Sequence, residues 1–141
     1  MSRSGYTDDC DDNLASGRWR GVVASAIRGK RGQSFLIELL AALDAMPEKR
    51  LIAQSFGKAG SYCTLGVIGA ARGAVMPVLT DDPDDYYDGD VAEMAGAALN
   101  IASPLAAEVM YHNDDWGWND TPEQRWVRMR AFVAERIKAQ P

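Results

Sequence analysis

The chain has 141 residues, a net charge of −5 and a hydrophobic share of 47%. This length fits one domain with one sizeable core, since single domains commonly hold roughly 100–150 residues. The negative net charge argues against a protein that coats nucleic acid indiscriminately, because such binding needs a positive surface. The sequence contains neither a stretch of roughly 20 apolar residues nor the apolar run of a signal peptide. We therefore expect a soluble, cytoplasmic protein that does not enter a membrane.

The first residues of the chain differ from the rest in composition. Residues 1–12 are rich in Ser, Gly and Asp and have no apolar periodicity. Such a segment buries too little apolar surface to become ordered, so we expect a disordered acidic tail followed by a single helical domain over 13–141. Cys10 lies in this tail and Cys63 in an apolar run, which does not predict a disulfide framework. Cys63 is instead expected to be a small buried hydrophobic residue.

Two helices are predicted between Asn13 and Met46. Apolar residues recur there at steps of three and four, which places them on one face of each helix. These residues are Trp19, Val22, Val23, Ala26 and Ile27 in the first helix, and Leu36, Leu39, Leu40 and Leu43 in the second. Gly29 is placed to end the first helix in a left-handed conformation, and the second is expected to start at residues 32–34 and to stop before Pro47. We call residues 28–32, which join the two helices, the basic elbow.

The middle of the chain contains turn signals. Two apolar runs flank the turn at residues 57–60, which predicts a short β-hairpin. A helix is expected from about Thr64 to Arg72, closed by Gly73. An acidic loop follows over residues 74–89, and its spacing misses the calcium-loop pattern. We expect neither a metal site nor a cofactor there.

Three more helices are predicted in the second half of the chain. Asp90 is expected to cap the first and Ser103 the second, which runs to about His112. Thr121-Pro122-Glu123-Gln124 has the pattern of a capping box and starts the third. That helix is expected to bury Trp126, Met129, Val133 and Ile137 and to leave Arg125, Arg128, Arg136 and Lys138 in solvent. The predicted fold class is mainly α: a single compact helical domain with at most one small β-hairpin.

The basic elbow concentrates positive charge where a helix begins, and the helix dipole also favours an anion there. The functional interpretation is a site for a phosphate or an acidic partner surface, and the simpler one is a solvated turn. Trp19 between two arginines has the composition of a base-stacking surface, but its place on the apolar stripe favours core packing. Neither common glycine-rich nucleotide-binding motif is present. The candidate anion- or partner-binding residues are Arg18, Arg20, Arg28, Lys30 and Arg31.

Two acidic stretches with aromatic residues are candidate partner-binding loops. The first is most simply a solvated acidic loop, but its paired tyrosines beside carboxylates also suit imitation of nucleic-acid charge or contact with a basic protein partner. The second contains tryptophans, which are enriched at interfaces. The two tryptophans of the second loop have an equally good interpretation as a lid folded back on the core. The candidate residues are Asp84, Asp85, Tyr86, Tyr87, Asp114, Asp115, Trp116 and Trp118.

Catalysis has weak support in the sequence. His112 is the only histidine, so a metal site with several histidines is excluded. A Cys63–His112 nucleophile and base pair stays open but is disfavoured, and no spacing selects a pair of carboxylates. We expect no catalytic residues and regard an enzyme as the minority interpretation.

Most of the chain resembles a family of small bacteriophage and prophage proteins of unknown function. The resemblance lies in residues 18–33 and 42–51, in the opening Ser2-Arg3-Ser4-Gly5-Tyr6, and in Thr121-Pro122-Glu123-Gln124-Arg125-Trp126. Residues 62–67 with Asn113-Asp114 are similar to a pattern in other short phage proteins. The resemblance implies expression inside a bacterial host, where small phage proteins often bind and block host factors.

These observations predict a non-catalytic protein that binds a host or phage macromolecule, most often another protein. Inhibition of a host defence system is one specific form of this prediction. The alternative is a binding module for nucleic acid or a small phosphorylated ligand that uses the basic elbow. An apolar stripe left uncovered on the two-helix hairpin would also favour a homodimer.

Overall fold

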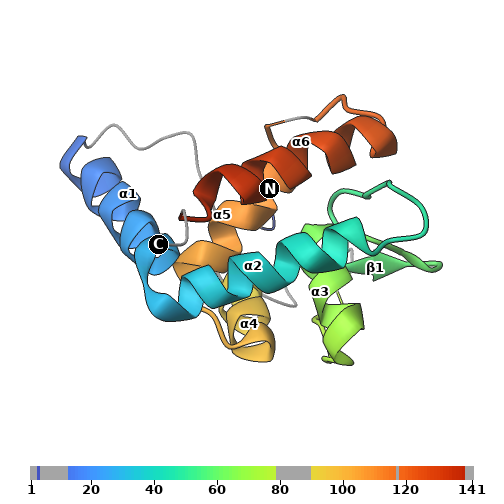
Figure 1. Cartoon of the computed structure of the whole chain (residues 1–141). Coiled ribbons are helices and arrows are strands. Elements are labelled where there is room, and N and C mark those ends of the chain that lie inside the picture. The colour runs from blue at the N-terminus through green and yellow to red at the C-terminus, as the bar shows by residue number, and fades with distance from the viewer. Residues whose placement is uncertain (1–2, 4–12, 79–89, 117, 139–141) are drawn as a thin grey trace.

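A computed structural model of the protein describes residues 3, 13–78, 90–116 and 118–138 (Figure 1). Among these residues the structure has six helices and one two-stranded antiparallel sheet, which confirms the mainly α fold with a small hairpin. The elements are α1 (Asn13–Arg28), α2 (Lys30–Asp44), β1 (Gly57–Lys58), β2 (Ser61–Tyr62), α3 (Thr64–Arg72), α4 (Asp90–Leu99), α5 (Ser103–Asp114) and α6 (Pro122–Arg136). None of the described helices is both long and apolar enough to cross a bilayer.

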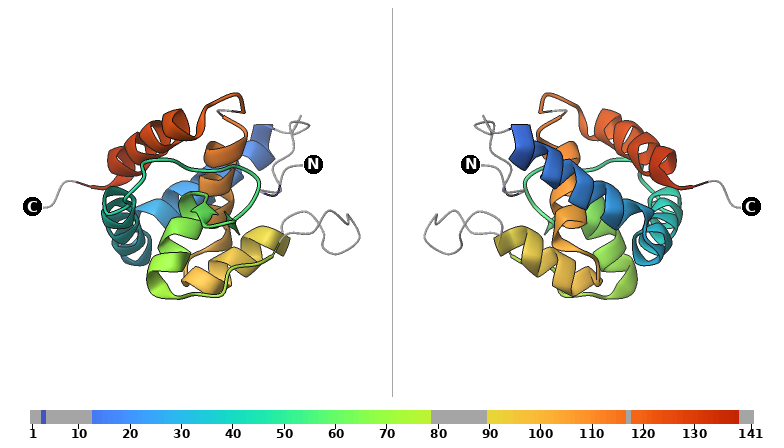
Figure 2. Two further views of the ribbon diagram at one scale, coloured as in Figure 1. Left: turned by 90° about the vertical axis from the view of Figure 1, so that its right-hand side faces the viewer. Right: turned by 90° about the vertical axis from the view of Figure 1, so that its left-hand side faces the viewer.

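Helix α5 lies in the middle of the molecule, with the other helices around it (Figure 2). Its sequence explains this position, because apolar residues occur on every side of the helix and a helix of this kind is stable only when surrounded. Its fully buried apolar residues are Leu105, Ala106, Ala107, Val109 and Met110. Leu36, Leu39 and Leu43 of α2 are also fully buried, which confirms the predicted apolar face of that helix.

The predicted hairpin and the following helix are both present. Gly57 pairs with Tyr62 across a turn in which Ala59 and Gly60 have positive φ, as tight hairpin turns require. Helix α3 then has the predicted bounds. Gly73 ends it in the left-handed conformation, with φ of 68°, which a glycine adopts without steric cost.

The predicted starts of α2 and α5 differ from the structure, and α2 begins at Lys30 instead of residues 32–34. Gly29 is extended, with φ of −64° and ψ of 159°, so the prediction of a left-handed end was wrong. The Gly29 N–H donates to Ser25 O, and its carbonyl accepts from Gln33 N, so one residue both closes α1 and starts α2. Helix α5 is capped by Ala102 instead of Ser103 and continues to Asp114. Helix α4 begins at Asp90, and the residue before it lies outside the described residues.

The capping box of the last helix is confirmed. Thr121 Oγ1 accepts from Gln124 N at 3.1 Å, and Gln124 Oε1 accepts from Thr121 N at 2.9 Å. These bonds satisfy two N–H groups that no helix can satisfy internally. Of the tail predicted over 1–12, the structure describes Arg3 alone, and it is buried.

Candidate binding site at the basic elbow

The basic elbow is a close contact between the last turn of α1 and the first turn of α2. A Cβ atom added to Gly32 would lie 1.9 Å from Ala26 O, a distance that no side chain tolerates. Glycine at this position therefore lets the two helices approach backbone to backbone.

The end of α6 holds the elbow from the other side. Gln33 Nε2 donates to Ile27 O at 2.7 Å and to Arg136 O at 3.0 Å, and Gln33 Oε1 accepts from Lys138 N at 2.8 Å. Lys138 Nζ donates to Arg28 O at 2.9 Å. These bonds satisfy carbonyls at the end of α1 that have no helical partner. The elbow is thus fixed by three helices.

The predicted anion- or partner-binding residues of this region are all exposed. None of them forms an ion pair with another residue that the structure describes. The stretch 13–37 contains no acidic residue at all, which is unusual in a chain with a net charge of −5. We call Arg18, Arg20, Arg28, Lys30 and Arg31 the elbow cations.

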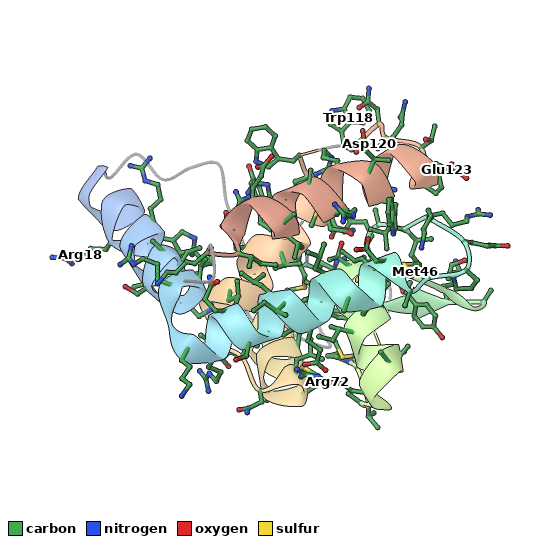
Figure 3. All side chains as sticks on the ribbon, viewed as in Figure 1. Arg18, Met46, Arg72, Trp118, Asp120 and Glu123 are labelled. Atoms are coloured by element: carbon green, nitrogen blue, oxygen red, sulfur yellow. The ribbon has the colours of Figure 1, made fainter. Side chains whose placement is uncertain are left out.

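Helix α1 presents apolar side chains among these cations. Trp19 is 38% exposed and Val22 is 49% exposed, so the prediction that both pack in the core was wrong. Val23 is the only buried residue between 17 and 28, although α1 packs on both α5 and α2. Periodicity predicted the face of the helix, but it carries no information on how far a neighbour extends along that face. The side chain of Arg18 points outward from α1 (Figure 3).

A small pocket of about 240 Å³ adjoins the elbow. It is lined by Ser25 and Ala26, by residues 29–32, and by Ile101, Ala102 and Leu105. Helices α2 and α5 both begin here, and neither start has a side-chain cap. Lys30 and Arg31 therefore border a cavity at the positive ends of two helices, a setting that favours an anionic group.

The predicted partner-binding residues of the second acidic stretch differ in their exposure. Asp114 is 2% exposed and bonded to Arg3, so its prediction as an exposed partner-binding residue was wrong. Asp115 is half-buried and has a partner of its own. Trp116 is 64% exposed, and its ring stacks on His112 with the ring centroids 5.4 Å apart. Trp118 is 81% exposed, which excludes it as a lid on the core.

The exposed Trp118 and the basic elbow do not form one site. Trp118 lies near the start of α6, whereas Arg18 lies on α1 at the opposite end of the molecule (Figure 3). The other candidate residues of the acidic loops, Asp84, Asp85, Tyr86 and Tyr87, lie outside the described residues.

Sequence reasoning missed a buried polar cluster at the end of α5. Arg125 was expected in solvent but is 5% exposed, and it donates to Asn113 O at 3.0 Å and to Leu51 O at 3.2 Å. Burial lowers the pKa of Arg125, while the nearby Asp120 carboxylate acts in the opposite direction. Arg128 donates to Asn113 O at 3.3 Å and to Asp120 Oδ2 at 2.7 Å. Both arginines satisfy carbonyls at the open end of α5.

Arg3 completes this cluster. Its Nε donates to Asp114 Oδ2 at 2.6 Å and its Nη2 to Asp114 Oδ1 at 3.0 Å. Burial alone would lower the pKa of Arg3, but the neighbouring Cys63 and Asp114 raise it above its ordinary value. No local pattern marked this residue, because its partner is 111 positions away in the chain.

Cys63 and His112 have different partners. Cys63 is 1% exposed, which confirms it as a buried residue, and its sulfur accepts from Gly66 N at 3.4 Å. His112 bonds to Glu108 at 2.9 Å and lies between the Trp116 and Phe132 rings. Within the described part of the chain, no group of three His, Cys, Asp or Glu side chains is placed to hold a metal ion. The geometry therefore gives no support to the Cys63–His112 pair.

Comparison of the chain with protein-family models, with curated proteins and with solved structures gave no match.

Proposed function

We propose that this protein is a non-catalytic binding protein that docks an acidic surface of another protein onto α1 and the basic elbow. The observation that carries the proposal is the set of elbow cations, which are exposed and have no ionic partner among the described residues. Holding like charges together on an uncompensated surface costs free energy through repulsion, and an acidic partner removes that cost.

The apolar residues of α1 favour a protein partner over nucleic acid. Trp19 and Val22 are exposed between the cations. Tryptophan and arginine are the residue types that most often dominate the binding energy of protein interfaces. The pocket beside Lys30 and Arg31 offers a place for one carboxylate of the partner.

The charge of the remaining chain also disfavours nucleic acid. Outside 13–37 the sequence has ten basic residues against twenty acidic ones. A long polyphosphate would meet this negative surface beyond the elbow, and its binding would weaken accordingly. An acidic patch on a folded partner is small enough to contact the elbow cations alone.

The resemblance to small phage proteins suggests the setting of this interaction. In that setting the partner is a host or phage protein in the bacterial cytoplasm. Inhibition of a host defence protein is the most specific form of the proposal.

The test compares two variants with the same change in charge. Lys30→Glu/Arg31→Glu reverses the elbow, and Arg50→Glu/Lys58→Glu reverses two exposed cations elsewhere. Each tagged protein is used to capture partners from bacterial lysate, with and without nuclease, and the captured material is identified by mass spectrometry.

We expect the unchanged protein and the control variant to capture the same stoichiometric protein after nuclease treatment, and the elbow variant to lose it. Equal capture by both variants would remove the elbow as the site. Capture that disappears with nuclease would instead establish nucleic acid as the ligand.

A further inference from the structure

The Arg3 side chain is buried beside α5. We call the residues around its guanidinium group, Asp114, Phe56 and Cys63, the Asp114 socket. The side chains of Arg3 and Asp114 are 3% and 0% exposed, and both carboxylate oxygens accept from the guanidinium. The Phe56 ring lies under the guanidinium, with 4.7 Å between the ring centroid and Cζ. A flat cation is thus held both by its edge and by its face.

The socket is built by parts of the chain far from residue 3. Asp114 Oδ1 also accepts from Asn113 Nδ2 at 2.8 Å and from Gln54 N at 3.1 Å. Asn113 is fixed in turn by Thr64 Oγ1, which donates to it at 2.7 Å. The carboxylate is therefore oriented by α5, by α3 and by the segment before β1, through contacts that do not involve Arg3.

Gln54 shows that the backbone is shaped around this carboxylate. Its φ is +64°, a left-handed conformation that non-glycine residues rarely adopt. In this conformation the Gln54 N–H donates to Asp114. Strained residues of this kind persist where the surrounding structure requires them, and they cluster at binding sites.

The fit of Arg3 in the socket is incomplete. Arg3 Nη1 is buried and has no hydrogen-bond partner among the described residues. A buried donor without an acceptor costs free energy, so the socket holds Arg3 less strongly than it would if all of its N–H groups were bonded. An arginine that enters with this N–H directed to water, or to an acceptor of its own molecule, avoids that cost.

We propose that the Asp114 socket is a guanidinium-binding site that Arg3 fills within the chain and that accepts an arginine side chain from another molecule when Arg3 is withdrawn. The ligand class is an arginine-bearing peptide segment. The socket contains none of the elbow cations, so a test of the socket is independent of the proposed function.

Arg3→Ala tests the socket by chemical rescue. The variant leaves a buried carboxylate without its cation, and we expect its melting temperature to fall by about 10 °C. Millimolar methylguanidinium, or a peptide with the sequence of residues 1–6, should restore most of this loss. Methylammonium, or the same peptide with lysine in place of Arg3, should restore little, because a lysine cannot bond to both oxygens.

Three results would overturn the proposal. They are an unchanged melting temperature in Arg3→Ala, no rescue by either guanidinium compound, and equal rescue by the lysine peptide. If Arg3→Ala does not fold, its recovery of helical circular dichroism with methylguanidinium replaces the melting curve. The folded Arg3→Lys variant is then titrated with the arginine peptide. The proposal is contradicted if methylguanidinium restores no circular dichroism and the peptide does not bind.

Discussion

The arginines at the end of α5 and the cations of α1 and the elbow have the same chemistry but different surroundings. Arg3, Arg125 and Arg128 each donate to a carbonyl or carboxylate oxygen, whereas the elbow cations face solvent without an ion pair to any described residue. The first group connects segments that are distant in the chain. Only the second group is free to meet another molecule.

Helix ends explain why the two groups differ. The C-terminal end of α5 has open carbonyls and a partial negative charge, and Arg125 and Arg128 supply the donors that it needs. The elbow includes the start of α2, where the partial charge is positive and repels nearby cations. Position relative to a helix end therefore distinguishes Arg125 and Arg128, which bond to the end of α5, from Lys30 and Arg31 at the start of α2.

The largest effect is expected when one of the buried arginines loses its charge. Arg125→Met removes the donor from Leu51 O and one of the two donors to Asn113 O, which keeps Arg128. An unfilled buried acceptor costs about 1–3 kcal/mol, and a lost hydrogen bond from a charged group costs about 1.5–3 kcal/mol. We expect the free energy of unfolding in urea to fall by about 2–4 kcal/mol. Arg20→Met on the exposed helix is the matched control and should change it by less than about 0.5 kcal/mol. Equal effects of the two variants would abolish the distinction between the groups.

A smaller effect is expected from a methyl group at the elbow. Gly32→Ala places a Cβ atom against Ala26 O and should cost about 1–3 kcal/mol, as overpacked sites do. Gly17→Ala is its control, because nothing lies within 4 Å of the added atom. The control should stabilise the helix by up to about 1 kcal/mol. Urea unfolding of both variants measures the difference, and an unchanged stability of Gly32→Ala would refute the close contact.

The smallest effect concerns a surface ion pair. The hydrogen bond from Arg72 lowers the pKa of Glu38 below its ordinary value of 4.5. A lowered pKa in the folded state adds stability above pH 4.5, and that stability is lost as the pH falls through the folded value. Because the Glu38 side chain is half-exposed, screening limits the contribution to less than about 1 kcal/mol. The stability difference between the unchanged protein and Glu38→Gln should shrink below pH 4.5, and a constant difference would argue against the pair.

Local signals in the sequence predicted the parts of the fold that depend on local chemistry. The capping box at Thr121 and the glycine stop at Gly73 act within one helical turn, and both are present. The hairpin turn is similar, because its conformation depends on Ala59 and Gly60 themselves. Such features need no knowledge of the rest of the molecule.

The composition of the sites depends on contacts between distant segments, and the sequence did not reveal them. Asp114 looked like an exposed acidic residue until Arg3 was placed against it. Arg125 follows the pattern of a solvent-facing residue, yet its acceptors belong to α5 and to Leu51. Trp19 failed in the other direction, because it follows the apolar stripe of α1 and yet is 38% exposed. The elbow cations are all exposed, as their prediction as binding residues requires.

One measurement tests whether the elbow cations are reserved for binding. A variant in which all five are replaced by glutamine is melted beside the unchanged protein and Arg125→Met. The account predicts a melting temperature equal to that of the unchanged protein or slightly higher, because repulsion among five like charges is removed. A fall as large as that of Arg125→Met would show that the elbow cations hold the fold together, and would contradict the account.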